Sequence, residues 1–206
     1  MNTLSKTIKT YIFYATSAFG ASLAIKANIG VSSFNSMNVA ISNAAEIKIG
    51  TITIAINLLF LLTYAFLTHF KKIKTYFVQT ATIFMFGSLI NFYTYQLLDT
   101  VNVSDYIVKI AFISFGTIIS GLSIGMIVRY DVITLPVEGS CLELSKLTKH
   151  SFSKLRYAID IFSIIISIVI SFGYELPLYV REGTLISMIL FTGSIALIQK
   201  RSPVTI

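Results

Sequence analysis

Six stretches of this chain are apolar over the length that a helix needs to cross a lipid bilayer, about 20 residues. They are Thr10–Ala27, Thr51–Phe70, Thr75–Leu98, Tyr106–Val128, Leu155–Gly173 and Thr184–Gln199. Charged residues make up 12% of the chain, where soluble domains carry about a quarter. We therefore predict an all-α polytopic transmembrane bundle of about six helices, forming one integral membrane domain over residues 1–206. Because the first and last segments are short, five crossings is the alternative.

The basic residues predict an orientation for this bundle. Lys71–Lys74 is a basic loop, Asp99–Asp105 contains no basic residue, and Arg129–Arg156 is again rich in lysine and arginine. Basic loops face the cytoplasm, so we expect both termini inside. The net charge of +7 is explained by these loops. We expect the lipid bilayer as a partner and no nucleic acid.

Two segments interrupt the apolar pattern in the same way. Gly20–Asn38 and Gly121–Gly139 each begin as an apolar helix with small residues and continue into polar, turn-forming residues. An offset of 101 residues aligns Gly20 with Gly121 and Ser22 with Ser123. We predict two half-repeats, 8–98 and 105–201, of three helices each. They would have inverted topology, as in secondary transporters, with irregular or re-entrant segments after helices 1 and 4.

Small residues spaced by four positions predict close helix packing near the centre of the bundle. Gly20 and Ala24 form one such pair, and Gly121 and Gly125 form the other. Pairs of this kind let two helix backbones approach closely. The alternative is that they line a pore.

Several polar residues are candidates for a substrate site. The amides of Asn28, Asn35 and Asn38 can donate and accept hydrogen bonds. Pro136 suits the first turn of a short helix, which is either interfacial or a re-entrant element presenting Glu138. Asp160 lies inside the fifth apolar segment, where a charge is costly; it either pairs with Arg156 or carries a coupling proton or substrate. The hypothesised substrate-binding set is Asn28, Asn35, Asn38, Arg129, Glu138 and Asp160.

Four stretches carry a resemblance to a known family. They are AFGASLAIKANIGVSSFNSMNVAIS, IGTITIAINLLFLL, LPVEGSCLELSKLTKHSFSKLRYAIDI and GTLISMILFTGSIALIQK. The chain resembles the YitT/YczE family of bacterial membrane proteins, in which residues similar to Glu138-Gly139, Phe152, Lys154 and Asp160 stand at these positions. The resemblance implies a multi-pass protein of the bacterial plasma membrane that is associated with transport, and it implies no substrate class.

These observations favour a small transporter or permease of an unidentified polar metabolite, acting alone or as a homodimer. The alternatives are a substrate-capture subunit that needs ATPase and coupling subunits, and a non-transporting membrane factor. No Ser-His-Asp set, glycine-rich nucleotide loop or catalytic carboxylate pair is present, so we expect no enzyme and no cofactor. One cysteine, Cys141, and two histidines predict no metal site.

Overall fold

The computed structural model describes residues 3–130 and 132–200, and all regular structure in these residues is helical. The helices are α1 (Thr3–Ala27), α2 (Ser33–Ala45), α3 (Ile49–Leu67), α4 (Ile73–Phe92) with a π-helical turn (Tyr93–Leu97), α5 (Tyr106–Tyr130), α6 (Pro136–Thr148), α7 (Phe152–Gly173) and α8 (Glu182–Lys200). The all-α prediction is confirmed, and each of the six predicted long helices is present. Residue 201, where the second half-repeat was predicted to end, lies outside the described residues.

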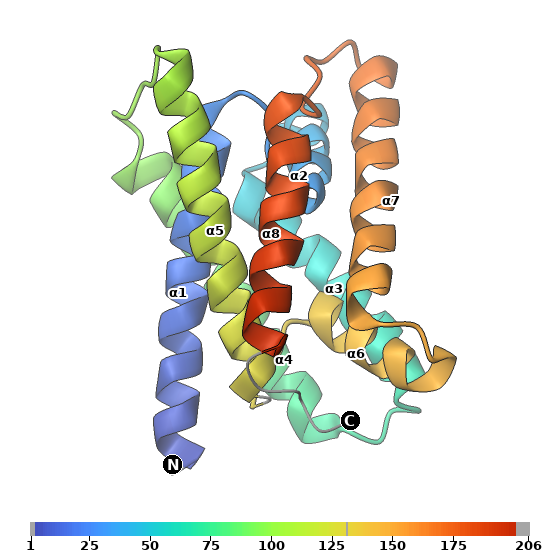
Figure 1. Cartoon of the computed structure of the whole chain (residues 1–206). Coiled ribbons are helices and arrows are strands. Elements are labelled where there is room, and N and C mark those ends of the chain that lie inside the picture. Colours follow the sequence, from blue (N-terminus) through green and yellow to red (C-terminus); the bar gives the residue numbers. More distant parts are fainter. Residues whose placement is uncertain (1–2, 131, 201–206) are drawn as a thin grey trace.

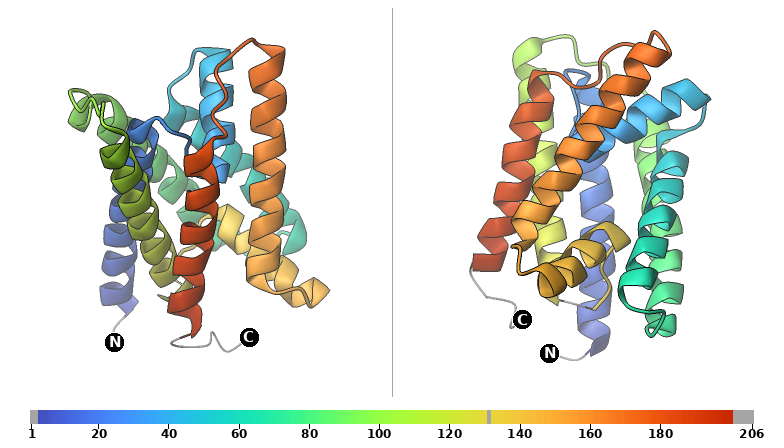
Figure 2. Two further views of the ribbon diagram at one scale, coloured as in Figure 1. Left: turned by 45° about the horizontal axis from the view of Figure 1, so that its top comes forward. Right: turned by 90° about the vertical axis from the view of Figure 1, so that its right-hand side faces the viewer.

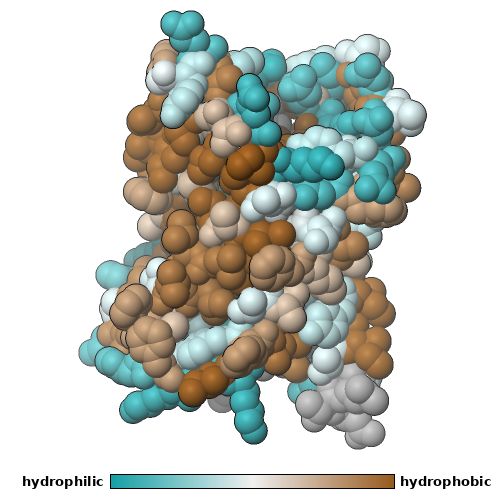
Figure 3. Space-filling model, turned by 180° about the vertical axis from the view of Figure 1, so that it is seen from behind, coloured by the Kyte–Doolittle hydropathy of each residue, from teal (hydrophilic) through white to brown (hydrophobic). Residues whose placement is uncertain are grey.

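Within the described residues, four helical segments are long and apolar enough to cross a membrane. They are Ile49–Leu67, Ile73–Leu97, Tyr106–Tyr130 and Phe152–Gly173, and α8 adds a shorter apolar helix, Glu182–Ile198. Hydrophobic side chains cover much of the middle of the face in Figure 3, and hydrophilic side chains gather at its two ends. This is the surface of a membrane protein.

Helix α7 shows how the chain is adapted to lipid. Its serines at every fourth position, Ser163, Ser167 and Ser171, are buried. Its large apolar side chains face outward, and Ile165 and Val169 are 54% and 64% exposed. A surface helix of a soluble protein has the reverse pattern, with its apolar stripe facing the core. Helix α7 therefore places its small polar face against other helices and its apolar face toward lipid.

Helix α2 corrects one expectation from the sequence. The segment after the first long helix was predicted to be irregular, yet thirteen of its residues, Ser33–Ala45, are helical. Serine and asparagine have low helix propensity because their side chains compete for backbone hydrogen bonds. Packing overrides this preference here, because α2 lies along α7 and the Ser167 hydroxyl donates to the Ser36 carbonyl at 3.0 Å. The segment after the fourth long helix contains the expected helix, α6, with Pro136 in its first turn.

The starts of three pairs of helices are separated by 103 residues along the chain, the same separation as between the bonded serines Ser17 and Ser120. Helices α1 and α5 begin at Thr3 and Tyr106, α2 and α6 at Ser33 and Pro136, and α3 and α7 at Ile49 and Phe152. The short helices even end alike, on the positive-φ residues Glu46 (φ 58°) and Lys149 (φ 59°). The offset of 101 from the sequence is therefore wrong, because it rested on a few isolated identities.

The packing of the helices follows the same correspondence. Helix α1 packs along α5, α2 packs on α7, and α6 packs on α3. Helices α1 and α5 run in opposite directions, and the short helices α2 and α6 lie toward opposite ends of the molecule (Figures 1 and 2). The start of α1, the end of α8 and the α3–α4 connection lie at one end, and the connection between α4 and α5 lies at the other (Figure 1).

Candidate functional site

A cavity of about 60 Å³ lies where all eight helices meet, with at least one lining residue from each. A buried water needs about 10–15 Å³ of such space, so the cavity has room for a few waters or one small solute. Its apolar lining includes the rings of Phe34, Phe86 and Phe191. Its polar lining is Ser17, Ser32, Asn35, Thr53, Asn57, Thr117, Ser120, Glu138 and Arg156. A largely apolar cavity that contains buried polar and charged groups in the centre of a membrane bundle is the natural candidate site.

Arg156 enters the cavity from the first half of α7 and is held on three sides. Its Nη1 donates to Asp160 Oδ1 at 3.0 Å, one turn along the same helix, and both side chains are buried. Its guanidinium also lies over the rings of Phe34 and Phe191, 5.8 and 5.2 Å from their centroids. The Nε atom makes no hydrogen bond to any residue that the structure describes. Asp160 is thus the counter-ion of Arg156, and Arg156 is the member of the pair that lines the cavity.

Glu138 enters the same cavity from the first turn of α6. It is 6% exposed, and its Oε2 makes no hydrogen bond within residues 3–130 and 132–200. The residues from Pro136 to Cys141 are buried, whereas the end of α6 is exposed. Helix α6 therefore runs from the buried centre of the protein to its surface.

Helix α3 supplies the matching face from the first half of the chain. Thr53 and Asn57 line the cavity and stand 103 positions before Arg156 and Asp160. Asn57 Nδ2 donates to the Thr53 carbonyl at 2.8 Å, and Asn57 Oδ1 has no partner. One half of the chain contributes uncharged polar groups at the positions where the other half contributes an ion pair.

Helices α1 and α5 close the cavity on another side through small residues. The hydroxyls of Ser17 and Ser120 are 3.1 Å apart, and Ser120 also donates to the Ser17 carbonyl at 2.7 Å. Gly20 and Gly116 lie against each other, so that a methyl group on either would overlap the carbonyl oxygen of the other. The helices cross at this point with backbone in contact with backbone.

The predicted packing glycines are only partly placed as expected. Gly20 and Ala24 are in the tight α1–α5 contact and line the cavity. Gly121 and Gly125 instead face α8, where a methyl group on Gly121 would lie 2.8 Å from Ser194 Cβ. The close partner of Gly20 is Gly116, which the alignment of the two halves did not indicate.

The six predicted substrate-binding residues divide into three groups. Asn35 and Glu138 line the cavity. Asp160 and Asn38 lie behind it, since Asp160 binds Arg156 and the fully buried Asn38 donates to Thr53 Oγ1 at 3.1 Å. Asn28 and Arg129 are exposed and do not line it. Asn28 has a positive φ of 50°, and its carbonyl accepts from Arg181 at 3.4 Å. Asn28 and Arg129 both stand at helix ends, where a polar side chain is explained by contact with the surface.

The sequence reasoning missed most of the cavity. Arg156 was treated only as a neutralising partner and counted among the loop charges, although it is 4% exposed. Thr53, Thr117 and Ser120 were not singled out at all. Thr53 could have been identified, because Thr53 and Asn57 have the same four-residue spacing as Arg156 and Asp160.

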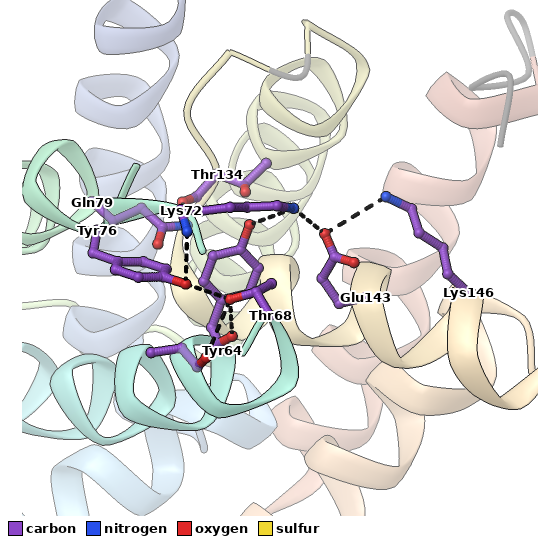
Figure 4. Close-up of polar contacts among 9 residues, drawn as sticks. Tyr64, Thr68, Lys72, Tyr76, Gln79, Thr134, Glu143 and Lys146 are labelled. Atoms are coloured by element: carbon purple, nitrogen blue, oxygen red, sulfur yellow. Dashed lines mark hydrogen bonds and ion pairs between the residues drawn. The ribbon is translucent and has the colours of Figure 1, made fainter. Parts of the chain in front are cut away.

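A polar network ties α6 to the α3–α4 hairpin at the surface end of this short helix (Figure 4). Lys72 Nζ forms an ion pair with Glu143 on α6 and donates to Tyr64 OH at 3.4 Å. Gln79 on α4 donates to the Thr134 carbonyl at 2.9 Å, just before α6 begins. The helix that carries Glu138 into the cavity is therefore anchored from both ends to the first half of the chain.

The ion pair shifts the pKa of both partners. The hydrogen bond to Glu143 raises the pKa of Lys72. Burial alone would raise the pKa of Glu143, but the hydrogen bond and charge of Lys72, with the charge of Lys146, offset this and lower it. A lowered carboxyl pKa contributes stability above the unfolded-state pKa, and this contribution disappears as the pH falls through the folded-state pKa.

We therefore expect Glu143→Gln to reduce stability slightly at neutral pH and not at strongly acid pH. The loss should be below about 1 kcal/mol, because the Lys72 side chain is 43% exposed and solvent screens the pair. Thermal unfolding of both proteins from neutral to acid pH measures this difference. Glu175→Gln, at an exposed carboxylate, is the matched control and should follow the wild type. A difference that persists unchanged in acid would contradict the ion-pair explanation.

The fold and the cavity together define an all-helical membrane protein with a polar site enclosed by both halves of the chain. A family model matches residues 5–200, and the chain belongs to this family, which is described as a family of unknown function (DUF6198). No curated protein and no solved structure shows a significant match to the chain. The resemblance to the YitT/YczE family stays a prediction.

Proposed function

We propose that this protein is a small transporter of a polar metabolite and that its substrate binds in the cavity between the two halves. The observation that carries the proposal is the lining of this cavity. Glu138 and Arg156 are buried in the middle of a membrane bundle, and each has a polar atom without a partner. Ionisable groups inside membrane proteins are costly and mark substrate and ion pathways.

The proposed architecture is an inverted repeat of two halves, offset by 103 residues. The recurring helix bounds support it, as do the opposite directions of α1 and α5 and the exchange in which α2 packs on α7 while α6 packs on α3. In transporters built this way, broken helices from both repeats form the site, and rocking of one part against the other opens it to alternate sides. Helices α2 and α6 are the broken elements in this proposal.

The proposed topology has six crossings, with both termini and Lys71–Lys74 at the cytoplasmic face of the bacterial plasma membrane. The distribution of basic residues supports this orientation. The start of α1, the end of α8 and the α3–α4 connection lie at the same end of the molecule (Figure 1). The loop Asp99–Asp105, which has no basic residue, would then face outward.

Cysteine labelling tests the transport proposal. Ala21 lines the cavity and is 7% exposed, so Ala21→Cys places a thiol there with little change in volume. In a Cys141→Ser background, we expect a membrane-impermeant methanethiosulfonate to modify this thiol in both right-side-out and inside-out vesicles. A site with alternating access is open to each side in turn, so both preparations should react.

Three control variants define the outcomes. Ser104→Cys and Ile73→Cys, both at exposed positions, identify the sides and should react only in right-side-out and only in inside-out vesicles, respectively. Ala65→Cys, buried at 5% exposure and outside the cavity lining, should react in neither. If Ala21→Cys behaves like Ala65→Cys, the cavity is a closed structural void. The reverse pattern for the two side markers would overturn the proposed orientation.

A further inference from the structure

We propose that the cavity binds a small zwitterion, a solute with a protonated amine at one end and a carboxylate or similar anionic group at the other. This inference rests on the proposed transport function and names its substrate class. It follows from the unpaired polar groups of the cavity, which form two sets of opposite character.

The first set accepts hydrogen bonds and carries negative charge. Glu138 Oε2 and Asn57 Oδ1 both line the cavity without a partner. A buried acceptor without a hydrogen bond costs about 1–3 kcal/mol, and more if it is charged. The guanidinium of Arg156 is already bonded to Asp160, so with both buried carboxyl groups ionised the site has one negative charge more than Arg156 balances. A ligand ammonium group supplies both the missing charge and the missing N–H donors.

The second set donates hydrogen bonds and carries partial positive charge. Helix α2 begins at the cavity, where Ser32, Phe34 and Asn35 line the wall, and Ser32 makes no side-chain capping bond. The first N–H groups of a helix have no partner within it, and together they act as about half a positive charge. Arg156 Nε, also unpaired, adds a further donor from α7. A ligand carboxylate matches this set.

The difference between the two short helices gives the site its polarity. Helices α2 and α6 both begin at the cavity, and Asn35 on α2 stands 103 positions before Glu138 on α6. Glu138 places a carboxylate in the first turn of its own helix and offsets the positive end of α6. Asn35 is neutral, so the positive end of α2 stays available. A cation alone would leave the donors of α2 unmatched, and an anion alone would lie beside Glu138.

The size of the cavity limits the solute further. A water occupies about 10–15 Å³ of such space, so the cavity of about 60 Å³ holds about four to six water-sized groups. Glycine and β-alanine have about that many non-hydrogen atoms. The rings of Phe34 and Phe191 already lie against Arg156, but the ring of Phe86 in the wall suits an ammonium group, which is attracted to the face of an aromatic ring.

Calorimetric titration of the purified full-length protein in lipid nanodiscs tests the inference. The ligands are glycine and β-alanine, with methylammonium and acetate as the two halves of the same chemistry. We expect a zwitterion to bind at least about tenfold more tightly than either half, because each half leaves one set of buried groups unpaired. The inference is overturned if either half binds as tightly as the zwitterions, or if none of the four ligands binds.

Two variants examine the two ends separately. Glu138→Gln keeps the shape of the side chain and removes its charge, so zwitterion binding should weaken at least about tenfold while acetate binding is retained or strengthened. Asn35→Asp places a carboxylate at the start of α2 and should weaken zwitterion binding while favouring methylammonium. Glu175→Gln, at an exposed residue, should bind as the wild type does. Equal loss of all ligands in both variants would contradict a site with two ends.

The two proposals fail in distinguishable ways. If Ala21→Cys is labelled from both sides but neither zwitterion binds, the transport function stands and the substrate class is wrong. If a zwitterion binds but the thiol is reached from one side only, the substrate class stands and the protein captures its ligand without alternating access. Absence of both labelling and binding overturns both proposals.

Discussion

Gly116→Ala is expected to destabilise the protein strongly, whereas Gly193→Ala stabilises it. A methyl group on Gly116 would overlap the Gly20 carbonyl oxygen, and the atoms that would have to move are helix backbone. Overpacking costs about 1–3 kcal/mol and occasionally more, and we expect the upper part of this range because no side chain can rotate away. No atom lies within 4 Å of the methyl position on Gly193, so replacement there gains about 1 kcal/mol of helix propensity.

Thermal unfolding in one detergent measures both effects, and the opposite signs make the comparison decisive. Both variants replace glycine by alanine in a long helix and are measured in the same detergent. The gain in helix propensity is therefore the same in both, and the difference between them reports the local contacts of the added methyl group. Gly121→Ala should lie between them, since its methyl would be 2.8 Å from Ser194 Cβ and 2.9 Å from the Phe191 carbonyl oxygen. Equal unfolding midpoints for Gly116→Ala and the wild type would contradict the direct α1–α5 contact.

The contact between Gly20 and Gly116 also shows where reasoning from the sequence stops. Aligning two halves identifies residues in equivalent positions, and it does not identify residues that touch. In an antiparallel crossing, the residue numbers of successive contacts decrease along one helix while they increase along the other. Gly20 contacts Gly116, and Ser17, one turn earlier, contacts Ser120. The sequence predicted close packing at Gly20, which is correct, but the alignment of Gly20 with Gly121 gave no indication of its contact with Gly116.

The helices themselves were predictable for a simple physical reason. A span of about 20 apolar residues stands out in any composition, so the four apolar helical segments Ile49–Leu67, Ile73–Leu97, Tyr106–Tyr130 and Phe152–Gly173 were found. Helix α2 was missed because its buried face is polar, with Ser33, Ser36, Asn38 and Ser42 among its buried residues. The hydrophobic periodicity that identifies a helix in a soluble protein is therefore absent from the buried face of this one.

The cavity could be predicted only in part, because its residues come from eight helices whose packing the sequence does not give. Glu138 and Asn35 were found because polar residues in an otherwise apolar chain are conspicuous. Asn28 and Arg129 were equally conspicuous and lie at the surface. Polarity alone does not distinguish a residue at a helix end from a residue in the cavity wall. This distinction requires the positions of the helices, including the 103-residue separation between equivalent helix starts.

The Arg156–Asp160 pair gives the second large effect expected of this protein. Asp160→Asn keeps the volume of the side chain and removes the charge that balances a guanidinium buried at 4% exposure. Breaking a buried ion pair by removing one partner typically costs about 3–5 kcal/mol, because the remaining charge is left uncompensated. We expect a loss toward the lower end of this range for the single variant, because Glu138, the other buried carboxylate of the cavity, still faces Arg156 there. The rings of Phe34 and Phe191 stay over Arg156, but a cation–π contact is worth only about 2 kcal/mol even when desolvated.

The double variant Arg156→Gln/Asp160→Asn should recover most of this loss, since replacing a whole buried pair with neutral groups is often close to neutral. Thermal unfolding of the wild type, the two single variants and the double variant forms a complete cycle, and Asp99→Asn at an exposed residue is the control. Recovery in the double variant would show that Asp160 serves to balance Arg156. The double variant could instead lose as much stability as the two single variants lose together. Arg156 and Asp160 would then each have a separate partner, and the partner of Arg156 would be Glu138, the other buried carboxylate of the cavity. The role of Glu138 as the free acceptor of the site therefore depends on the outcome of this cycle.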